Sequence, residues 1–167
     1  AFNFTSDVHA AFHSHTVSPE LLARTSGLPH AVTQAKTVLI GCGSLGSKIG
    51  MHLARAGIGQ QTFVDTDIMS PHNFARHALL EDESTLVPYK AEQMRVALGR
   101  LSHLDAKAHD LDAVELFRDD KKFAEIVPAD TALIIETTAS LQVLIAASVS
   151  AALTASLVRL ARAALFG

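Results

Sequence analysis

The residues that could carry chemistry in this chain begin with a glycine-rich segment after a short apolar run. Gly41, Gly43 and Gly46 follow the apolar residues 38–40, and apolar residues at helical spacing come next. This order predicts a strand, a tight turn and a helix N-terminus, which together bind a nucleotide phosphate. Gly41 would permit the turn, Gly43 would let phosphate approach the backbone, and Gly46 would let the helix pack closely on the strand. Ser44 belongs to the same phosphate-binding loop. The alternative is a close helix–strand contact without a ligand.

Two acidic residues follow the next apolar run. Asp65 lies 24 residues after Gly41, where a carboxylate typically accepts hydrogen bonds from ribose hydroxyls. A turn residue or a helix cap is the alternative interpretation of Asp65. Asp67 is expected to shape or cap the loop at the nucleotide. These residues fit either a dinucleotide or ATP and do not distinguish between them.

Three further polar residues favour ATP. Asn73, Arg76 and Lys90 offer one amide and two cations, which a plain NAD-binding module has no reason to carry. Arginine presents a planar fork to phosphate oxygens, and lysine presents a point charge. A solvated surface charge is the commoner fate of any single arginine or lysine. The position of these residues downstream of the glycine loop favours contact with phosphate instead.

The order of these motifs resembles that of one enzyme superfamily. In chain order the motifs are Gly-Cys-Gly-Ser-Leu-Gly-Ser from position 41, Ala-Gly-Ile-Gly at 56–59, Val-Asp-Thr-Asp at 64–67, Asn-Phe-Ala-Arg-His at 73–77 and Tyr-Lys-Ala at 89–91. Over residues 37–140 the chain resembles the ThiF/MoeB/ubiquitin-activating-enzyme superfamily. The Asn-x-x-Arg-His form is similar to that of its bacterial ThiF-like branch.

The resemblance implies an activity, cofactors and partners. Members bind ATP with Mg²⁺ and adenylate the C-terminal carboxylate of a small ubiquitin-like β-grasp protein, releasing pyrophosphate. By the same resemblance, Asp65 would hold the ribose, while Asn73, Arg76 and Lys90 would contact the triphosphate. Preorganised cations and amide donors stabilise the negative charge that gathers on phosphate oxygens in such a transition state. The resemblance also implies a homodimer.

The chain departs from the superfamily pattern after the fourth expected strand. The resemblance leads us to expect an aspartate that helps bind magnesium and phosphate, but Ala139 stands there. Glu136 is the remaining candidate metal ligand, although it could simply cap the following helix. Cys42 is the only thiol, and we interpret it as structural because it lies inside the phosphate loop. Two alternatives therefore stay open: a catalytically degenerate nucleotide-binding module, and an NAD(P)-dependent oxidoreductase domain.

Composition restricts the class of protein. The 167 residues are 49% hydrophobic and 19% charged, which suits a globular chain with a core. A net charge of −3 and 5% aromatic residues argue against nucleic-acid binding. One cysteine allows no internal disulfide, and no secretory signal is recognisable, so we expect a cytoplasmic protein. A weak metal signal comes from three clustered histidines, His9, His13 and His15.

The apolar patterns predict an α/β chain with a Rossmann-like, doubly wound, mainly parallel sheet and helices on both faces. Residues 1–35 are expected to form an arm with a short helix that Ser18 caps, and residues 36–167 the nucleotide-binding domain, with truncation at its C-terminus left open as an interpretation. The uncharged stretch 141–158 is interpreted as a buried or interfacial helix rather than a membrane span. Strands are expected at 37–41, 61–65, 106–109 and 132–135, and the main helices after 44, at 90–101, at 112–126 and from 140.

Overall fold

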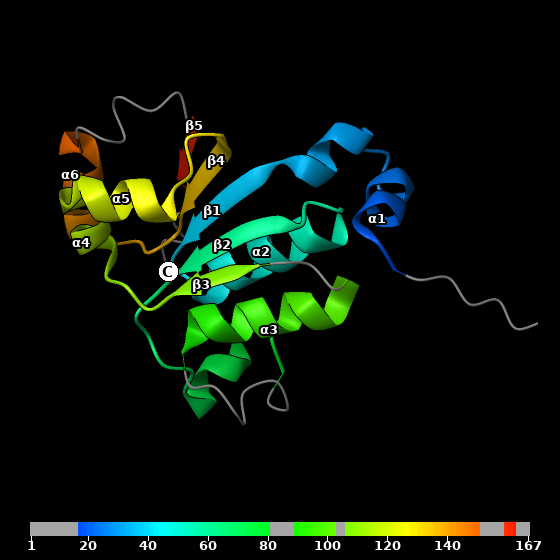
Figure 1. Ribbon diagram of the computed structural model, residues 1–167. Coiled ribbons are helices and arrows are strands. Elements are labelled where there is room, and N and C mark those ends of the chain that lie inside the picture. The colour runs from blue at the N-terminus through cyan, green and yellow to red at the C-terminus, as the bar shows by residue number, and fades with distance from the viewer. Residues whose placement is uncertain (1–16, 81–88, 103–105, 151–158, 163–167) are drawn as a thin grey trace, which may run out of the picture.

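A five-stranded parallel sheet forms the centre of the molecule in a computed structural model, which describes residues 17–80, 89–102, 106–150 and 159–162 (Figure 1). The strand order is β3-β2-β1-β4-β5, which confirms the predicted Rossmann-like, doubly wound sheet. The strands are β1 (Lys36–Ile40), β2 (Gln60–Val64), β3 (Lys107–His109), β4 (Thr131–Glu136) and β5 (Arg159–Arg162).

Register brings the carboxyl ends of the three central strands to one edge of the sheet. Ile40 at the end of β1 pairs with Val64 of β2 on one side and with Glu136 of β4 on the other. The strand order reverses between β1 and β4. In open α/β sheets, ligands bind in the crevice outside the carboxyl ends of the strands at this reversal.

Helices cover both faces of the sheet, as predicted. One face carries α2 and α3, whose apolar side chains pack with Leu39 and Phe63; the other carries α4, α5 and α6, which pack with Val38 and Ile40. Because neighbouring residues of a strand point to opposite faces, a continuous apolar run fills both cores. The helices are α2 (Ser44–Arg55), α3 (Lys90–Ser102), α4 (Ala113–Arg118), α5 (Asp120–Ile126) and α6 (Leu141–Val149).

A short helix precedes the sheet at the N-terminal side. Helix α1 (Pro19–Thr25) begins as predicted, with Ser18 Oγ accepting a hydrogen bond from the Leu21 N–H at 3.2 Å. Two 3-10 turns, η1 (His30–Gln34) and η2 (Pro71–Ala75), lie in segments for which no regular structure was expected. None of the helices in the described ranges combines the length and hydrophobicity needed to cross a membrane. The clustered histidines 9, 13 and 15 lie outside the described residues.

Two helix predictions were wrong in extent. The helix expected over 112–126 is two helices, because Asp119 adopts an extended backbone and its carboxylate caps α5 by accepting from the N–H groups of Lys121 and Lys122. The helix expected over 141–158 ends at Val149, with Ser150 extended as its cap, and positions 151–158 of that prediction lie outside the described residues. Strand β5, at 159–162, was not predicted. It is a strand because its backbone pairs with β4, and such pairing with a distant segment cannot be predicted from the local sequence.

Candidate nucleotide-binding site

The three glycines of the loop after β1 differ in how the fold depends on them. Gly41 has φ +93°, which side chains rarely adopt. A Cβ on Gly46 would lie 1.9 Å from the Gly41 carbonyl oxygen, so the fold itself requires glycine there. Gly43 has an ordinary backbone with φ −76°, and a Cβ there would meet no described residue within 4 Å other than its chain neighbours. The protein alone does not explain Gly43, whereas a phosphate seated close to the backbone would.

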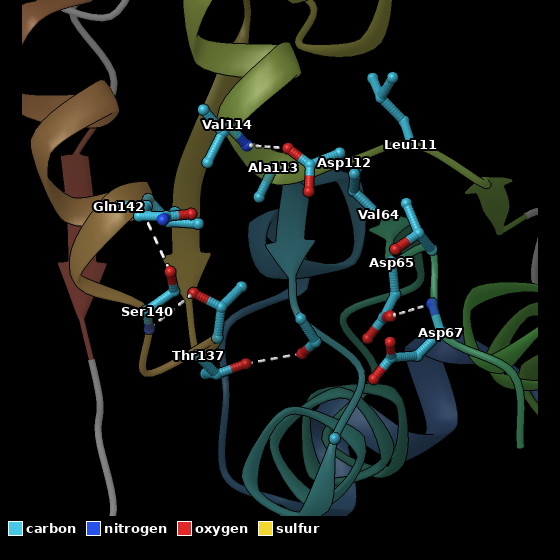
Figure 2. A pocket seen from close by; sticks show the side chains of 15 residues that line it. Val64, Asp65, Asp67, Leu111, Asp112, Ala113, Val114, Thr137, Ser140 and Gln142 are labelled. Carbon is cyan, nitrogen blue, oxygen red and sulfur yellow. Dashed lines mark hydrogen bonds between the residues drawn. The ribbon is translucent and has the colours of Figure 1, made fainter. Parts of the chain in front are cut away.

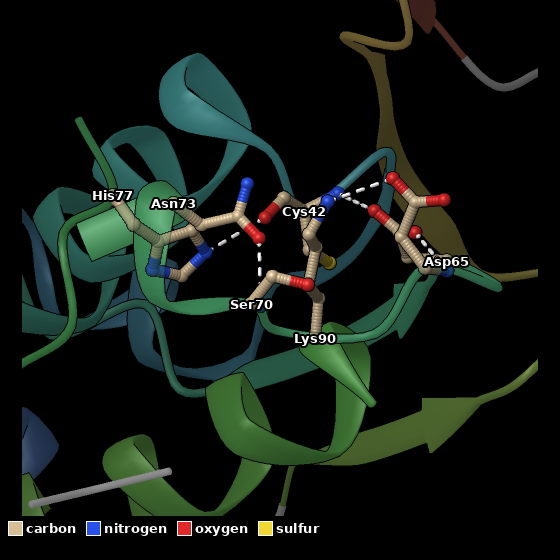
Figure 3. A network of polar contacts seen from close by, with 7 residues as sticks. Cys42, Asp65, Ser70, Asn73, His77 and Lys90 are labelled. Carbon is tan, nitrogen blue, oxygen red and sulfur yellow. Dashed lines mark hydrogen bonds and ion pairs between the residues drawn. The ribbon is translucent and has the colours of Figure 1, made fainter. Parts of the chain in front are cut away.

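Side chains from three other segments hold the peptide groups of this loop in place. Thr137 Oγ1 donates to the Gly41 carbonyl at 2.6 Å, and the Cys42 N–H donates to Asp65 Oδ2 at 2.5 Å. His77 Nε2 lies 2.8 Å from the Cys42 carbonyl oxygen. Figure 3 shows His77 and Asp65 on opposite sides of Cys42. The loop is therefore preorganised before any ligand binds.

Asp65 stands at the end of β2, as predicted, and faces the glycine loop. Its other carboxylate oxygen, Oδ1, accepts from the Asp67 N–H at 2.7 Å. Burial raises the pKa of Asp65, while the two backbone hydrogen bonds from Asp67 and Cys42 act in the opposite direction. Each carboxylate oxygen has a second lone pair, so Asp65 can still accept a hydrogen bond from a ribose hydroxyl.

Lys90 brings a buried cation to the loop. Its side chain is 9% exposed, and its Nζ lies 2.7 Å from Asp67 Oδ2. The Lys90 N–H also donates to the Asp67 carbonyl at 2.9 Å, beside an antiparallel bridge between Ile68 and Tyr89. Burial raises the pKa of the Cys42 thiol, and the nearby ammonium of Lys90 only partly opposes this. Cys42 is thus a protonated, buried thiol, in keeping with a structural role.

Arg76 and Asn73 lie beside the loop. Like the predicted residues Ser44, Gly46 and Lys90, they do not line the cavity described below. Asn73 is half-buried, and its Oδ1 accepts from the Ser70 N–H at 2.8 Å, which starts η2. Arg76 is exposed, and its backbone carbonyl accepts from Ser44 Oγ at 3.0 Å. The structure therefore places the Arg76 backbone beside the first turn of α2. Within the described part of the chain, its guanidinium forms no ion pair.

A cavity of about 250 Å³ opens at the carboxyl edge of the sheet, over the crevice between β1 and β4 (Figure 2). It combines the predicted residues Gly41, Gly43, Asp65 and Asp67. The remaining walls come from Val64 and Thr66 on either side of Asp65, from residues 111–114, and from residues 137, 138, 140, 142 and 143. Sequence reasoning missed these walls. The only local signals were the caps of α4 and α6, since cap residues mark helix N-termini that face this edge.

Glu136 and Ala139 bear on the magnesium expectation. The Glu136 side chain is buried, and its Oε1 accepts from both the N–H and the hydroxyl of Thr138. These contacts hold the backbone after β4, so Glu136 does not fit a magnesium ligand. Ala139 has φ +56°, a left-handed conformation in which Asn and Asp are enriched among non-glycine residues. Among the described residues, no three His, Cys, Asp or Glu side chains converge on a metal position.

The fold and the site together define a class: a Rossmann-type nucleotide-binding domain with a phosphate loop before α2 and a buried lysine beside it. The model of the ThiF family matches residues 23–150. The chain belongs to the ThiF family. The superfamily resemblance seen in the sequence is thereby confirmed.

Curated relatives match parts of the chain. The molybdopterin-synthase adenylyltransferase of Haemophilus influenzae is 32% identical over 95 residues, covering 56% of this chain and 37% of the relative. The Escherichia coli protein of that name is 31% identical over 108 residues, covering 65% and 41%. The ATP-dependent ubiquitin transferase-like protein Cap2 of Vibrio cholerae is 42% identical over 65 residues, covering 35% and 11%. The chain spans less than half the length of each of these relatives.

Solved structures show the same fold. The E. coli tRNA N6-threonylcarbamoyladenosine dehydratase TcdA superimposes with a TM-score of 0.67 at 22% identity, covering 84% of this chain and 57% of that one. E. coli MccB with AMPCPP and MccA superimposes with a TM-score of 0.53 at 19% identity, covering 70% and 32%. At these identities the likeness concerns the fold alone.

Proposed function

We propose that this chain is the nucleotide-binding part of an adenylyltransferase that binds ATP and activates the C-terminal carboxylate of a small ubiquitin-like β-grasp protein. One observation carries the proposal: the buried ammonium of Lys90, 2.7 Å from Asp67, beside the preorganised glycine loop. Burying a lysine side chain is costly unless it is paired, and among the described residues Lys90 forms its ion pair with the exposed carboxylate of Asp67. A triphosphate would give it a stronger partner.

The site residues would then take distinct roles. Asp65 would accept from the ribose, and Gly43 with Ser44 would present the N-terminus of α2 to phosphate. Lys90, Arg76 and Asn73 would surround the leaving pyrophosphate. The substrate carboxylate oxygen attacks the α-phosphorus, the bond from that phosphorus to the bridging oxygen breaks, and the electron pair leaves with pyrophosphate. Positioning and charge stabilisation supply the catalysis.

Magnesium supplies charge neutralisation on the phosphates when it is bound with ATP. We assign it no ligand among the described carboxylates, because Glu136 is committed to Thr138 and position 139 is alanine. This disagreement is the observation that favours the second candidate function, a degenerate module that binds a nucleotide without transferring it.

The partner class rests on relatives of this chain. They include molybdopterin-synthase adenylyltransferases and a ubiquitin transferase-like protein. By analogy, we propose a small protein with an accessible C-terminal carboxylate as the substrate, and a cytoplasmic location for the reaction. Cys42, the single thiol of the chain, is fully buried inside the loop, so we assign it no part in a later transfer step.

We also propose a homodimer, which the superfamily resemblance implies. Helix α6 exposes an apolar stripe at helical spacing, with Leu141 68%, Ile145 52% and Val149 72% exposed. A second copy of this chain could cover it. Sedimentation should show a dimer that Ile145→Asp converts to a monomer; a wild-type monomer at tens of micromolar concentration would contradict the proposal.

The decisive measurement is ATP–pyrophosphate exchange in the presence of candidate β-grasp proteins. Exchange should require a free C-terminal carboxylate, so a partner with an amidated C-terminus serves as the control. A protein that binds ATP but exchanges no pyrophosphate with any partner would support the degenerate module. Thermal-shift measurements compare ATP with NAD, and preferential stabilisation by NAD would overturn the adenylation proposal.

A further inference from the structure

The imidazole of His77 forms a hydrogen bond at each of its two nitrogens. His77 is 9% exposed, its Nε2 lies 2.8 Å from the Cys42 carbonyl oxygen, and its Nδ1 lies 3.2 Å from the Leu79 backbone nitrogen. A backbone N–H can only donate, so Nδ1 must be the acceptor and carry no proton. The proton of the neutral ring is therefore on Nε2, which donates to the Cys42 carbonyl.

This hydrogen bond controls a peptide group that matters for ligand binding. The Cys42 carbonyl and the Gly43 N–H belong to one planar trans peptide, so they point in opposite directions. Holding the carbonyl toward His77 turns the Gly43 N–H away from His77. Gly43 lines the cavity and immediately precedes α2, where backbone N–H groups attract phosphate.

The preceding peptide is already fixed from other directions. Thr137 holds the Gly41 carbonyl, and Asp65 holds the Cys42 N–H. The next peptide joins Cys42 to Gly43, and the side chain that contacts its carbonyl is His77, with Nε2 at 2.8 Å. In Figure 3 the dashed contact of His77 reaches Cys42 from the side opposite Asp65.

Neighbouring residues tie the same segment to α2. Ser44 Oγ donates to the Arg76 carbonyl at 3.0 Å, and Ser47 Oγ accepts from the Ala78 N–H at 3.0 Å. Residues 76, 77 and 78 each make one bond to the loop or to the first turns of α2. The segment that carries Arg76 is therefore docked on the glycine loop, with His77 at its centre.

We propose that His77 is a positioning residue for the nucleotide, whose Nε2–H orients the Cys42–Gly43 peptide so that the Gly43 N–H faces a bound phosphate. This inference rests on the proposed function, because it assumes that the loop holds the phosphates of ATP. It adds a residue with a defined atom-level task that the glycine motif does not contain.

Two substitutions separate the two hydrogen bonds of the ring. In His77→Gln, the amide nitrogen can take the place of Nε2 and still donate to the Cys42 carbonyl. In His77→Asn, the amide oxygen can take the place of Nδ1 and accept from Leu79, but no donor reaches Cys42. If His77 positions the peptide, a variant that keeps the hydrogen-bond donor to the Cys42 carbonyl should keep its affinity for ATP. A variant that keeps only the acceptor for the Leu79 N–H should lose affinity.

The experiment is titration of each variant with ATP by calorimetry, with thermal denaturation to verify folding. We expect His77→Asn to weaken ATP binding by about tenfold, the equivalent of about 1.4 kcal/mol, and His77→Gln to stay within about twofold of wild type. In the exchange assay, His77→Asn should raise the KM for ATP more than it lowers kcat. His52→Asn, an exposed histidine near the far end of α2, is the control and should change neither quantity.

The outcomes separate the two claims. If wild type binds ATP and a folded His77→Asn variant binds it equally well, the positioning role is wrong while the proposed function stands. If Gln and Asn weaken binding equally, the ring acts through packing and the positioning role is again wrong. If wild type binds no ATP at all, the proposed function fails, and the role of His77 fails with it.

Discussion

The ammonium of Lys90 and the carboxylate of Asp67 form an ion pair at 2.7 Å, although 23 residues separate them in sequence. Backbone pairing fixes this relationship, because the Lys90 N–H donates to the Asp67 carbonyl. The pair places a buried positive charge next to Asp65 and the glycine loop. It links the first turn of α3 to the end of β2, so the cation and the ribose-binding candidate come to one place.

Removing the Lys90 charge should abolish most of the exchange activity. Lys90→Met keeps an apolar stem of similar length but leaves no cation for the phosphates. Loss of one preorganised group at a transition state costs about 10²–10³ in rate, and we expect a loss of that size in ATP–pyrophosphate exchange. Lys107→Met, at an exposed lysine on β3, is the matched control. Equal rates for both variants would remove Lys90 from the mechanism.

The glycines of the loop should separate folding from binding. Gly46→Ala places a Cβ 1.9 Å from a backbone oxygen, so it should lower the free energy of unfolding by about 1–3 kcal/mol or more. In Gly43→Ala the added Cβ meets no atom of the described residues within 4 Å apart from its chain neighbours, so the variant should unfold like wild type. It should bind ATP about tenfold more weakly, because the Cβ would meet the phosphate. Urea denaturation and calorimetry measure the two effects. Normal ATP affinity in Gly43→Ala would mean that phosphate does not approach this residue.

Position 139 carries backbone strain that substitution should relieve. Ala139 sits at φ +56°, and the left-handed region costs an L-residue with a Cβ about 1–2 kcal/mol. Ala139→Gly should therefore raise the free energy of unfolding by up to about 1 kcal/mol in urea titrations, because the strain outweighs the extra chain entropy of glycine. Ala139→Val should destabilise the protein. A stabilising effect of valine would show that the backbone at 139 is not left-handed.

Ala139→Asp tests whether the missing carboxylate limits activity. Aspartate tolerates the left-handed backbone better than most residues do, so the variant should fold. In the degenerate-module alternative, the chain lacks activity because it has no carboxylate at position 139. Restoring that carboxylate should then create or raise magnesium-dependent pyrophosphate exchange. Ala139→Asn, which keeps the shape without the charge, is the control. Unchanged exchange in the Asp variant would show that position 139 does not limit activity.

Stability should depend on pH through His77. Burial lowers the pKa of His77, and the positive charges of Lys90 and Lys48 lower it further, against the opposing effect of the hydrogen bond to Cys42. The unfolded chain, with a histidine pKa near 6.5, then binds the proton more readily than the folded chain. Stability is therefore full above about pH 6.5 and falls as the pH drops toward the lower folded value.

This pH dependence can be assigned with two variants. In urea titrations between pH 5 and 8, His77→Gln should lose part of the acid-side decrease in the free energy of unfolding. His109, whose pKa burial also lowers, should account for a further part, so the double variant His77→Gln with His109→Gln should show the flattest profile. If the free energy of unfolding depended on pH in both variants as it does in wild type, His77 would not be a buried, neutral residue.

The sequence by itself determined the local chemistry of this protein. The apolar run, the glycines and the helical spacing after them predicted β1, the loop and α2, because strand and helix periods are properties of short segments. It also placed Asp65 at the end of β2, since an acidic residue directly after an apolar run marks the carboxyl edge of a parallel sheet. Only the tertiary structure decided which distant segments complete the site. His77 meets Cys42 across 35 positions, and Thr137 meets Gly41 across 96. Such contacts depend on how the strands stack and the helices pack, and local propensity carries no information about either. The same reason explains β5, which owes its strand conformation to pairing with β4.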